Sequence, residues 1–145
     1  MAHYIPSGFT AVTPYLVVTD VEGELAFMQQ VFGATELYRI PGPGGAPMHV
    51  ELQIGGARIM VGRARNAADV VTGMVCVYLP DVDAAFARAT AIAGATVAMP
   101  LADQFYGDRS GAVRSANGVY WHLATHVEDL TPQQIHDRMA AMKHP

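Results

Sequence analysis

Residues 20–35 read DVEGELAFMQQVFGAT, and residues 81–96 read DVDAAFARATAIAGAT, so the same framework returns 61 residues further along the chain. Each segment opens with Asp-Val and closes with Gly-Ala-Thr. Between these ends, apolar side chains recur at spacings of three and four residues, which predicts one amphipathic helix in each segment. A glycine at the end of such a pattern is a common helix stop. The sequence therefore predicts two copies of one structural unit.

Candidate strands surround each predicted helix. One run rich in Val, Leu and Tyr precedes the helix and three further runs follow it, so each unit has the order βαβββ. The expected strands are 13–18, 35–40, 48–54 and 57–62 in the first repeat (13–62), and 74–79, 96–99, 112–115 and 119–124 in the second repeat (74–124). Thr131-Pro132 with Gln134 has the form of a helix start, so a terminal helix is expected over 131–143. We expect a single α+β domain over 1–145, with curved mixed sheets around a cleft.

The composition narrows the range of partners. The chain is 51% hydrophobic, 15% charged and carries a formal net charge of −4. Its Lys and Arg residues never form a run, which argues against a nucleic-acid groove or a polybasic membrane patch. No apolar stretch is long enough to span a bilayer, and the first ten residues lack the order of a signal peptide. We therefore expect a cytoplasmic protein whose partner is a small molecule, in keeping with its single cysteine, Cys76.

Strand alternation separates a helix-covered face from an open face. In 48–54, the apolar Met48, Val50, Leu52 and Ile54 are expected under the helices, which leaves His49 and Glu51 on the open face. The same parity predicts further open-face residues in the other strands, namely Tyr15, Met60, Met74, Cys76, Tyr78, Tyr120 and His122. A cleft lined by tyrosine and methionine suits an apolar or aromatic ligand.

Four segments resemble a known family: TPYLVVTD (13–20), MHVEL (48–52), DQFYGDRSGAVR (103–114) and WHLATHVED (121–129). Together with the two βαβββ units, they resemble the PhnB-like branch of the vicinal oxygen chelate superfamily, which contains glyoxalase I, bleomycin-resistance proteins and extradiol dioxygenases. The resemblance covers roughly residues 8 to 130. It implies a homodimer, since members commonly dimerise so that sheets of two chains share a cleft. One fold hosts many functions, so the chemistry has to be argued from the site.

The resemblance also raises the question of a metal. Metal-dependent members place one ligand near the start of the first strand and one in the last strand of each half, and these places fall on Thr13, Met60, Met74 and His122. Only His122 is an ordinary ligand, because hard cations avoid thioethers. We therefore expect no cofactor. As an alternative, His49, Glu51 and His122 form a rebuilt divalent-metal site across the cleft.

His49 and Glu51 are the candidate catalytic residues. A histidine that titrates near neutral pH beside a carboxylate is suited to acid–base work. The alternative is an ion pair on a strand face or a dimer contact. Tyr15, Tyr78 and Tyr120 are candidates for stacking on a planar ligand, although aromatic side chains on strands often only pack.

Residues 104–109, QFYGDR, are expected to form a loop at the edge of the cleft. Tyr106 and Arg109 are candidate ligand contacts there, with Arg109 holding a carboxylate or phosphate. Alternatively, Arg109 shapes the loop through a salt bridge with Asp108 or Asp103. Cys76 is interpreted as a small apolar filler, and residues 126–129 as a polar turn.

Three functions remain open from the sequence. The first is a metal-independent isomerase, lyase or cyclase that uses His49 and Glu51 to move a proton. The second is a non-catalytic protein that sequesters an antibiotic or metabolite, as bleomycin-resistance relatives do. The third is a metal-dependent glyoxalase-like or dioxygenase-like enzyme that uses the rebuilt site.

Overall fold

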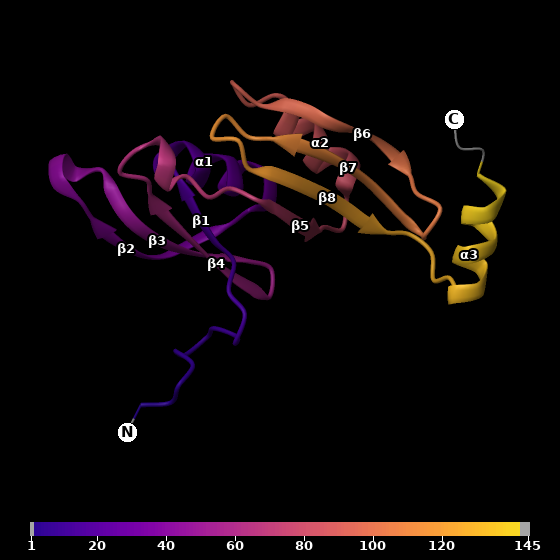
Figure 1. The fold of residues 1–145 in the computed structure, drawn as a ribbon, viewed down its shortest axis with the longest axis horizontal. Helices are drawn as coiled ribbons and strands as arrows, with labels where there is room; N and C mark the ends of the chain where they lie inside the picture. The colour runs from indigo at the N-terminus through magenta and orange to yellow at the C-terminus, as the bar shows by residue number, and fades with distance from the viewer. Residues whose placement is uncertain (1, 143–145) are drawn as a thin grey trace.

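The computed structural model describes residues 2–142. Its first half contains β1 (Tyr15–Val18), α1 (Val21–Phe32), β2 (Thr35–Pro41), β3 (Pro47–Ile54) and β4 (Ala57–Arg63), and its second half contains β5 (Met74–Tyr78), α2 (Val82–Thr90), β6 (Thr96–Asp103), β7 (Asp108–Arg114) and β8 (Tyr120–His126) (Figure 1). The helix α3 (Pro132–Ala141) follows, and residue 143 of the predicted terminal helix lies outside the described residues. The predicted α+β fold of two βαβββ units is confirmed.

Each half forms one mixed sheet of four strands. Sheet A has the strand order β1-β4-β3-β2, and sheet B has the equivalent order β5-β8-β7-β6. In both sheets the first and last strands of the unit pair in parallel, while the remaining neighbours pair antiparallel. Paired residues place their side chains on the same face, so the register shows which side chains share a face.

The two main helices begin in the same way but end differently. Asp20 accepts a hydrogen bond from the Gly23 backbone at 3.0 Å, and Asp81 accepts one from the Ala84 backbone at 3.1 Å, so both aspartates are N-caps. Gly33 ends α1 with a left-handed φ of 66°, as expected. The second helix ends at Thr90, so the expectation that its Gly-Ala-Thr segment (94–96) ends it is wrong. There the backbone tightens into short-range turns, with Ile92 donating to the Ala89 carbonyl.

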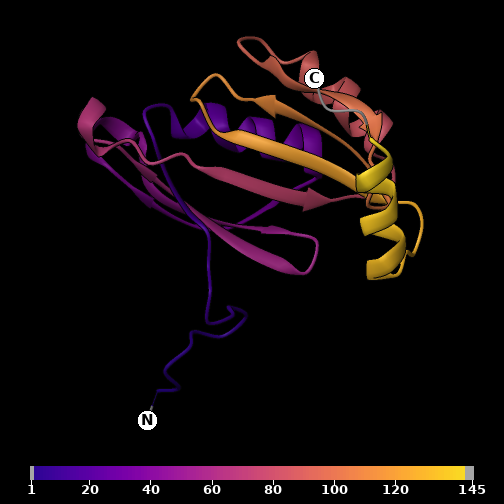
Figure 2. The ribbon, with the colours of Figure 1, turned by 45° about the vertical axis from the view of Figure 1, so that its right-hand side comes forward.

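One hydrophobic cluster joins the two halves. The inward faces of both sheets are buried as predicted, including Leu52 and Val61 of sheet A and Leu123 of sheet B. Helix α1 packs on sheet A and also reaches sheet B, where the Phe27 ring lies 6.0 Å from the ring of Trp121 (Figure 2). Met48 is an exception, because its side chain is exposed near the start of β3 rather than buried under a helix.

A buried carboxylate connects the halves. The side chain of Glu24 on α1 accepts hydrogen bonds from the Ser115 hydroxyl at 2.7 Å and from Nε1 of Trp121 at 3.0 Å. Next to it, Asn117 donates to the Asp20 carbonyl at 2.7 Å and accepts from its backbone nitrogen at 3.0 Å. Burial raises the pKa of Glu24 above its ordinary value. These contacts fix the position of α1 relative to sheet B.

The hairpin of β6 and β7 is longer than the sequence indicates. The predicted strands 96–99 and 112–115 extend to Thr96–Asp103 and Asp108–Arg114, so Arg109 lies on a strand rather than in a loop. The turn is closed at Gln104, whose backbone donates to the Asp108 carbonyl at 2.7 Å. Pro100 is tolerated because β6 is the edge strand of sheet B. Small residues and Pro100 interrupt the alternation of apolar and polar side chains in this region, so the sequence did not indicate the full length of these strands.

Both ends of the described chain project from the body. Figure 2 shows the segment before β1 running away from the sheets, while α3 lies beyond the far end of sheet B. The helix is held there by an ion pair between Arg138 and Glu128. Its apolar residues Met139 and Met142 are exposed. None of the helices in 2–142 combines the length and apolar character that crossing a membrane requires.

Candidate functional site

The side of sheet A opposite α1 carries a connected set of polar side chains. We call Tyr15, His49, Glu51 and Met60 the uncovered face of sheet A; the register places Tyr15 beside Met60 and Met60 beside Glu51. The Tyr15 hydroxyl lies 2.8 Å from Nδ1 of His49, and Nε2 of His49 lies 3.4 Å from Oε1 of Glu51. Both contacts are satisfied when His49 accepts from Tyr15 and donates to Glu51. The predicted pair is thus brought together, with Tyr15 as a third member.

Tyr15 is the most exposed member of this set, and His49 and Glu51 are more buried. Tyr15 is 47% exposed, whereas the side chains of His49 and Glu51 are only 19% and 20% exposed. In front of Tyr15 and His49 lies an open cavity of about 440 Å³, which Ile40 and Met48 also line. Tyr15 and His49 therefore both border the space that a ligand would occupy, together with the cations Arg63 and Arg65. The arrangement follows the general order of a reacting group, a base and an orienting carboxylate.

Sheet B presents a more apolar counterpart. We call Met74, Tyr78, Tyr120 and His122 the uncovered face of sheet B, on which β5 and β8 pair Met74 with Tyr120. Cys76 pairs with His122 on the same face. Met74 and Tyr78 are largely exposed, at 61% and 63%. Burial, with a smaller contribution from the Asp108 charge, raises the pKa of the Cys76 thiol, which keeps it protonated near neutral pH. These side chains offer contact area rather than reactivity.

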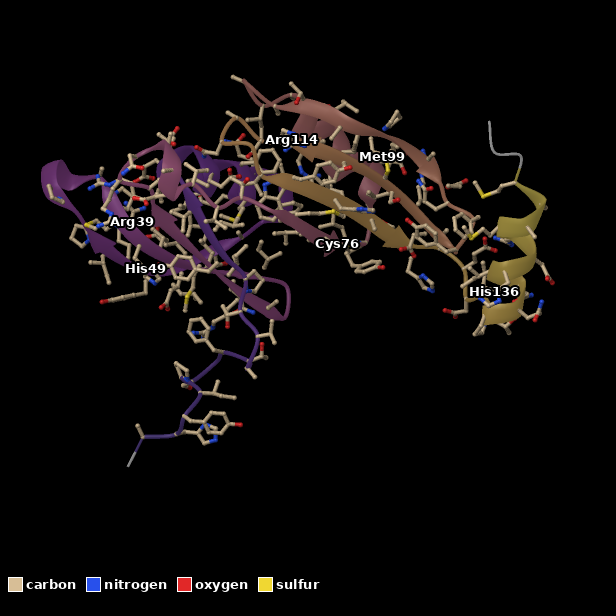
Figure 3. The ribbon with its side chains drawn as sticks, in the orientation of Figure 1. Arg39, His49, Cys76, Met99, Arg114 and His136 are labelled. Carbon is tan, nitrogen blue, oxygen red and sulfur yellow. The ribbon has the colours of Figure 1, made fainter. Side chains whose placement is uncertain are left out.

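The two uncovered faces do not combine into a metal site within one chain. His49 lies on sheet A and Cys76, the strand neighbour of His122, lies on sheet B (Figure 3). Within residues 2–142, no group of three or more His, Cys, Asp and Glu side chains is arranged to hold a metal ion. The rebuilt site of His49, Glu51 and His122 is therefore not formed in this chain.

The four places that resemble a metal site do not suit a metal either. Thr13 lies before β1, Met60 is on β4, Met74 is on β5 and His122 is on β8. Two thioethers, a hydroxyl and one imidazole are a poor donor set for a hard divalent cation. The chain's residues do not fit the metal that the resemblance implies.

Arg109 does not reach the uncovered face. Its guanidinium pairs with Asp83 of α2 at 2.9 Å and with Asp103 at 3.1 Å, which places it on the helix side of sheet B. The expected ligand contact is thus wrong for this residue, while the expected salt bridge with Asp103 is present. The same pairing lowers the pKa of Asp83. Tyr106 lies in the β6–β7 turn, partly buried with its ring against Phe105.

A second polar cluster was not expected from the sequence. Asp108 accepts from the Tyr78 hydroxyl at 2.9 Å and lies 2.8 Å from Nδ1 of His126, whose Nε2 is 2.8 Å from Asp129. The hydrogen bond with Asp108 raises the pKa of His126, and it also raises the pKa of Tyr78. Asp108 and His126 are paired residues of β7 and β8. The pairing was missed because the strand was expected to begin at residue 112, whereas β7 begins at Asp108. The carboxylates on both sides of the His126 ring favour its protonated form, and the contacts of Asp108 connect the ends of β5, β7 and β8.

Comparison with known proteins identifies the family. Residues 7–123 match the model of the Glyoxalase/Bleomycin resistance protein/Dioxygenase superfamily, which is most of the chain. This chain belongs to that superfamily. An uncharacterized protein of Mycobacterium bovis is 35% identical to it over 142 residues, covering 90% of this chain and 93% of the relative.

Solved structures of the superfamily share the fold. TioX from Micromonospora sp. ML1 is 32% identical, with a TM-score of 0.67 over 81% of this chain and 99% of TioX. The PhnB protein from Bacillus cereus has a TM-score of 0.67 over 80% of this chain and 99% of its own, at 17% identity. The fosfomycin resistance protein FosX from Listeria monocytogenes, solved with Mn(II) and 1S,2S-dihydroxypropylphosphonic acid, has a TM-score of 0.63 over 90% of this chain and 97% of its own, at 21% identity. At these last two identities the likeness concerns the fold alone.

Proposed function

We propose that this superfamily member is a metal-independent acid–base enzyme of the isomerase, lyase or cyclase type, acting on a small apolar or aromatic molecule. The observation that carries the proposal is the connected set of Tyr15, His49 and Glu51 beside an open cavity. In all three reaction types, proton transfer can assist the bond changes in the substrate without net oxidation, so an oxidant is not required. The finer placement in the PhnB-like branch is part of this proposal.

Each residue has a distinct role in this mechanism. Tyr15, the exposed member, exchanges a proton with the substrate. His49 takes up or returns the tyrosine proton through Nδ1, because that atom is 2.8 Å from the hydroxyl. Glu51 is a positioning residue that orients the imidazole and stabilises its protonated form. The rings and thioethers of both uncovered faces supply apolar contact for the ligand.

A second copy of the chain completes the cleft in this proposal. The accessible surface is 8611 Å², whereas a compact monomer of this mass exposes about 7,200 Å². The excess exceeds the roughly 800 Å² that each partner buries in an ordinary interface. Because the two uncovered faces stay apart within one chain, sheet A of one copy and sheet B of the other form the proposed cleft. Sedimentation should give a species of twice the 15.5 kDa chain mass.

The enzymatic proposal is tested by hydrogen–deuterium exchange. The aromatic ketone 2-tetralone carries acidic C–H groups next to its carbonyl, and a proton-moving site should exchange them in D₂O faster than buffer does. We expect Tyr15→Phe to abolish the acceleration, because the ring remains and only the hydroxyl is lost. Tyr38→Phe is the matched control, since Tyr38 pairs with Glu51 on the same side of sheet A. Equal exchange by Tyr15→Phe and the parent protein would reject the mechanism.

Sequestration is the second candidate function. It is favoured by the large exposed side chains of Met74 and Tyr78 on sheet B, which offer apolar contact area to a ligand. In this case 2-tetralone or a larger planar molecule binds and is recovered unchanged. Mass spectrometry of the bound fraction distinguishes the two functions, because binding without exchange in the parent protein supports sequestration alone.

A further inference from the structure

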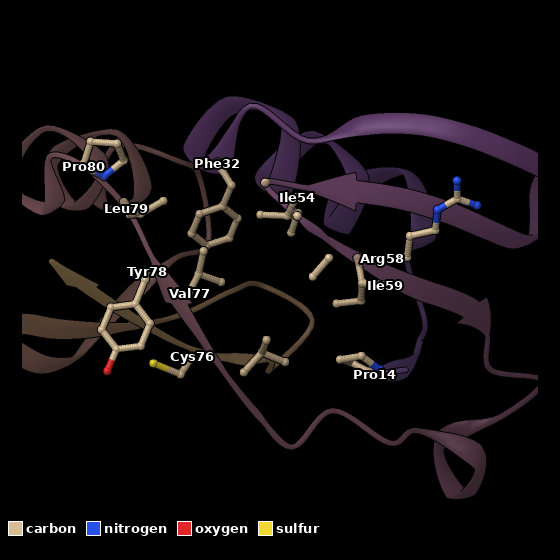
Figure 4. A pocket seen from close by; sticks show the side chains of 14 residues that line it. Pro14, Phe32, Ile54, Arg58, Ile59, Cys76, Val77, Tyr78, Leu79 and Pro80 are labelled. Atoms are coloured by element: carbon tan, nitrogen blue, oxygen red, sulfur yellow. The ribbon is translucent and has the colours of Figure 1, made fainter. Parts of the chain in front are cut away.

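A cavity of about 400 Å³ lies in the crease between the two halves. The turn that joins β3 to β4 forms one wall, and β5 with the residues after it forms the other (Figure 4). Phe32, the last residue of α1, and Pro14, just before β1, complete the lining. The cavity is therefore distinct from the open one in front of Tyr15 and His49, with which it shares no lining residue.

The cavity is lined mostly by aliphatic and aromatic side chains. Phe32, Ile54, Val75 and Leu79 are partly buried and pack against the hydrophobic core, while Ile59 and Val77 are buried. These side chains gain burial when an apolar molecule fills the space. The volume lies at the lower end of the roughly 300–1,000 Å³ usual for ligand pockets. The volume suits a small molecule.

The charges around the cavity favour a neutral molecule. Among the described residues that line it, none is acidic, and Arg58 is the single cation. Figure 4 shows the Arg58 guanidinium directed away from the cavity. There it lies 4.9 Å above the Phe9 ring and donates to Gln53 at 3.3 Å. A charged ligand would lose its hydration without gaining a partner in return.

The cavity also lies close to Trp121, whose indole N–H can report ligand binding. The ring of Phe32 is 5.0 Å from the ring of Trp121, the single tryptophan of the chain. Trp121 is fully buried and its Nε1 donates to Glu24 at 3.0 Å. A ligand that contacts Phe32 is therefore separated from the Trp121 ring by one side chain. Because the chain has a single tryptophan, its indole N–H gives one NMR resonance.

We propose that this cavity between the halves is a second binding site, which takes a small neutral apolar molecule. It shares no lining residue with the cavity in front of Tyr15 and His49, although Cys76 and Tyr78 of sheet B line it, and it does not depend on the acid–base reaction. An apolar molecule binds such a site because its transfer from water onto the aliphatic and aromatic lining is favourable. A bound molecule would fill the space between sheet A and sheet B.

Titration of the full chain with toluene tests the site, with benzoate as the charged probe of similar size. We expect toluene to move the Trp121 indole ¹H–¹⁵N resonance saturably and benzoate to leave it in place. Val75→Phe and Ile54→Phe fill the cavity from opposite walls and should weaken toluene binding by about tenfold or more. Val97→Phe is the matched control, because Val97 is exposed on β6, away from the cavity.

Comparison of 2-tetralone exchange with toluene binding shows whether the cavity acts independently of the acid–base residues. Tyr15→Phe should abolish exchange of 2-tetralone yet leave the toluene titration unchanged. No saturable shift in the parent protein, unweakened binding in both filled variants, or equal binding of benzoate would each overturn the proposal. Two filled variants are used so that misfolding of one leaves the other to decide.

Discussion

The two halves share one topology but use their histidines differently. In sheet A, His49 connects an exposed tyrosine to a half-buried glutamate, and the contact with Glu51 is long at 3.4 Å. In sheet B, His126 lies between Asp108 and Asp129, with both contacts at 2.8 Å. The first arrangement leaves a hydroxyl facing a cavity, whereas the second engages both ring nitrogens with carboxylates.

In our proposal, this difference separates an acid–base site in one half from a structural cluster in the other. The two carboxylates raise the pKa of His126, so its imidazole gives up its proton less readily than a histidine without such neighbours. His49 has one carboxylate neighbour and one hydroxyl neighbour, so a proton can move along the set. The predictions below test this contrast between the halves.

The largest expected effect concerns the two histidines. We expect His49→Gln to slow exchange of 2-tetralone by about 10²- to 10⁴-fold, the usual contribution of a general acid–base group. His126→Gln should leave the exchange rate unchanged, because His126 lies at the end of β8 with both ring nitrogens in contact with carboxylates. The measurement is the exchange rate followed by NMR in D₂O. A comparable loss in both variants would contradict the distinction.

The second largest effect is expected for Glu24, whose buried contacts connect the two halves. Glu24→Ala leaves the Ser115 hydroxyl and the Trp121 indole without their buried acceptor, so we expect a loss of roughly 2–4 kcal/mol in the free energy of unfolding. Chemical denaturation measures it. Gln29→Ala, on the exposed side of the same helix, is the control and should change little. A small loss for Glu24→Ala would mean that the halves are held by apolar packing alone.

A pH-dependent effect follows from the His126 cluster. Because its pKa is raised in the folded protein, the imidazolium adds stability that is complete below the unfolded value of about 6.5. This stability is lost as the pH rises through the raised value. The difference in unfolding free energy between the parent protein and His126→Gln should therefore shrink between mildly acidic and alkaline pH. A difference that grows with pH would show that the cluster does not hold a protonated histidine.

The smallest effect is expected for Arg109. Its charge faces Asp83 and Asp103 on the helix side, so Arg109→Gln should change 2-tetralone exchange and binding by no more than about twofold. Equilibrium dialysis and the exchange assay measure both quantities. A strong loss of binding would return Arg109 to the ligand site.

Local patterns allowed much of the fold to be predicted. The Asp-Val segments located the start of both helices and Gly33 the end of α1, since caps depend on neighbouring residues only, whereas α2 ends before its Gly-Ala-Thr segment. Alternation along β3 correctly placed His49 and Glu51 opposite the buried Val50 and Leu52. The prediction failed at β6 and β7, where Pro100 and several small residues gave no alternating pattern.

The sequence alone therefore determined the repeat, the two βαβββ units and the faces of most strands, because these follow from the periodicity of neighbouring residues. Tertiary structure decided which polar side chains meet. The contacts of Glu24 with Trp121 and of Asp108 with His126 join residues far apart in the chain. The hydrogen bond between Tyr15 and His49 likewise depends on the pairing of β4 with both β1 and β3. Strand order and register arise from packing of the whole core, so no local pattern encodes these partners.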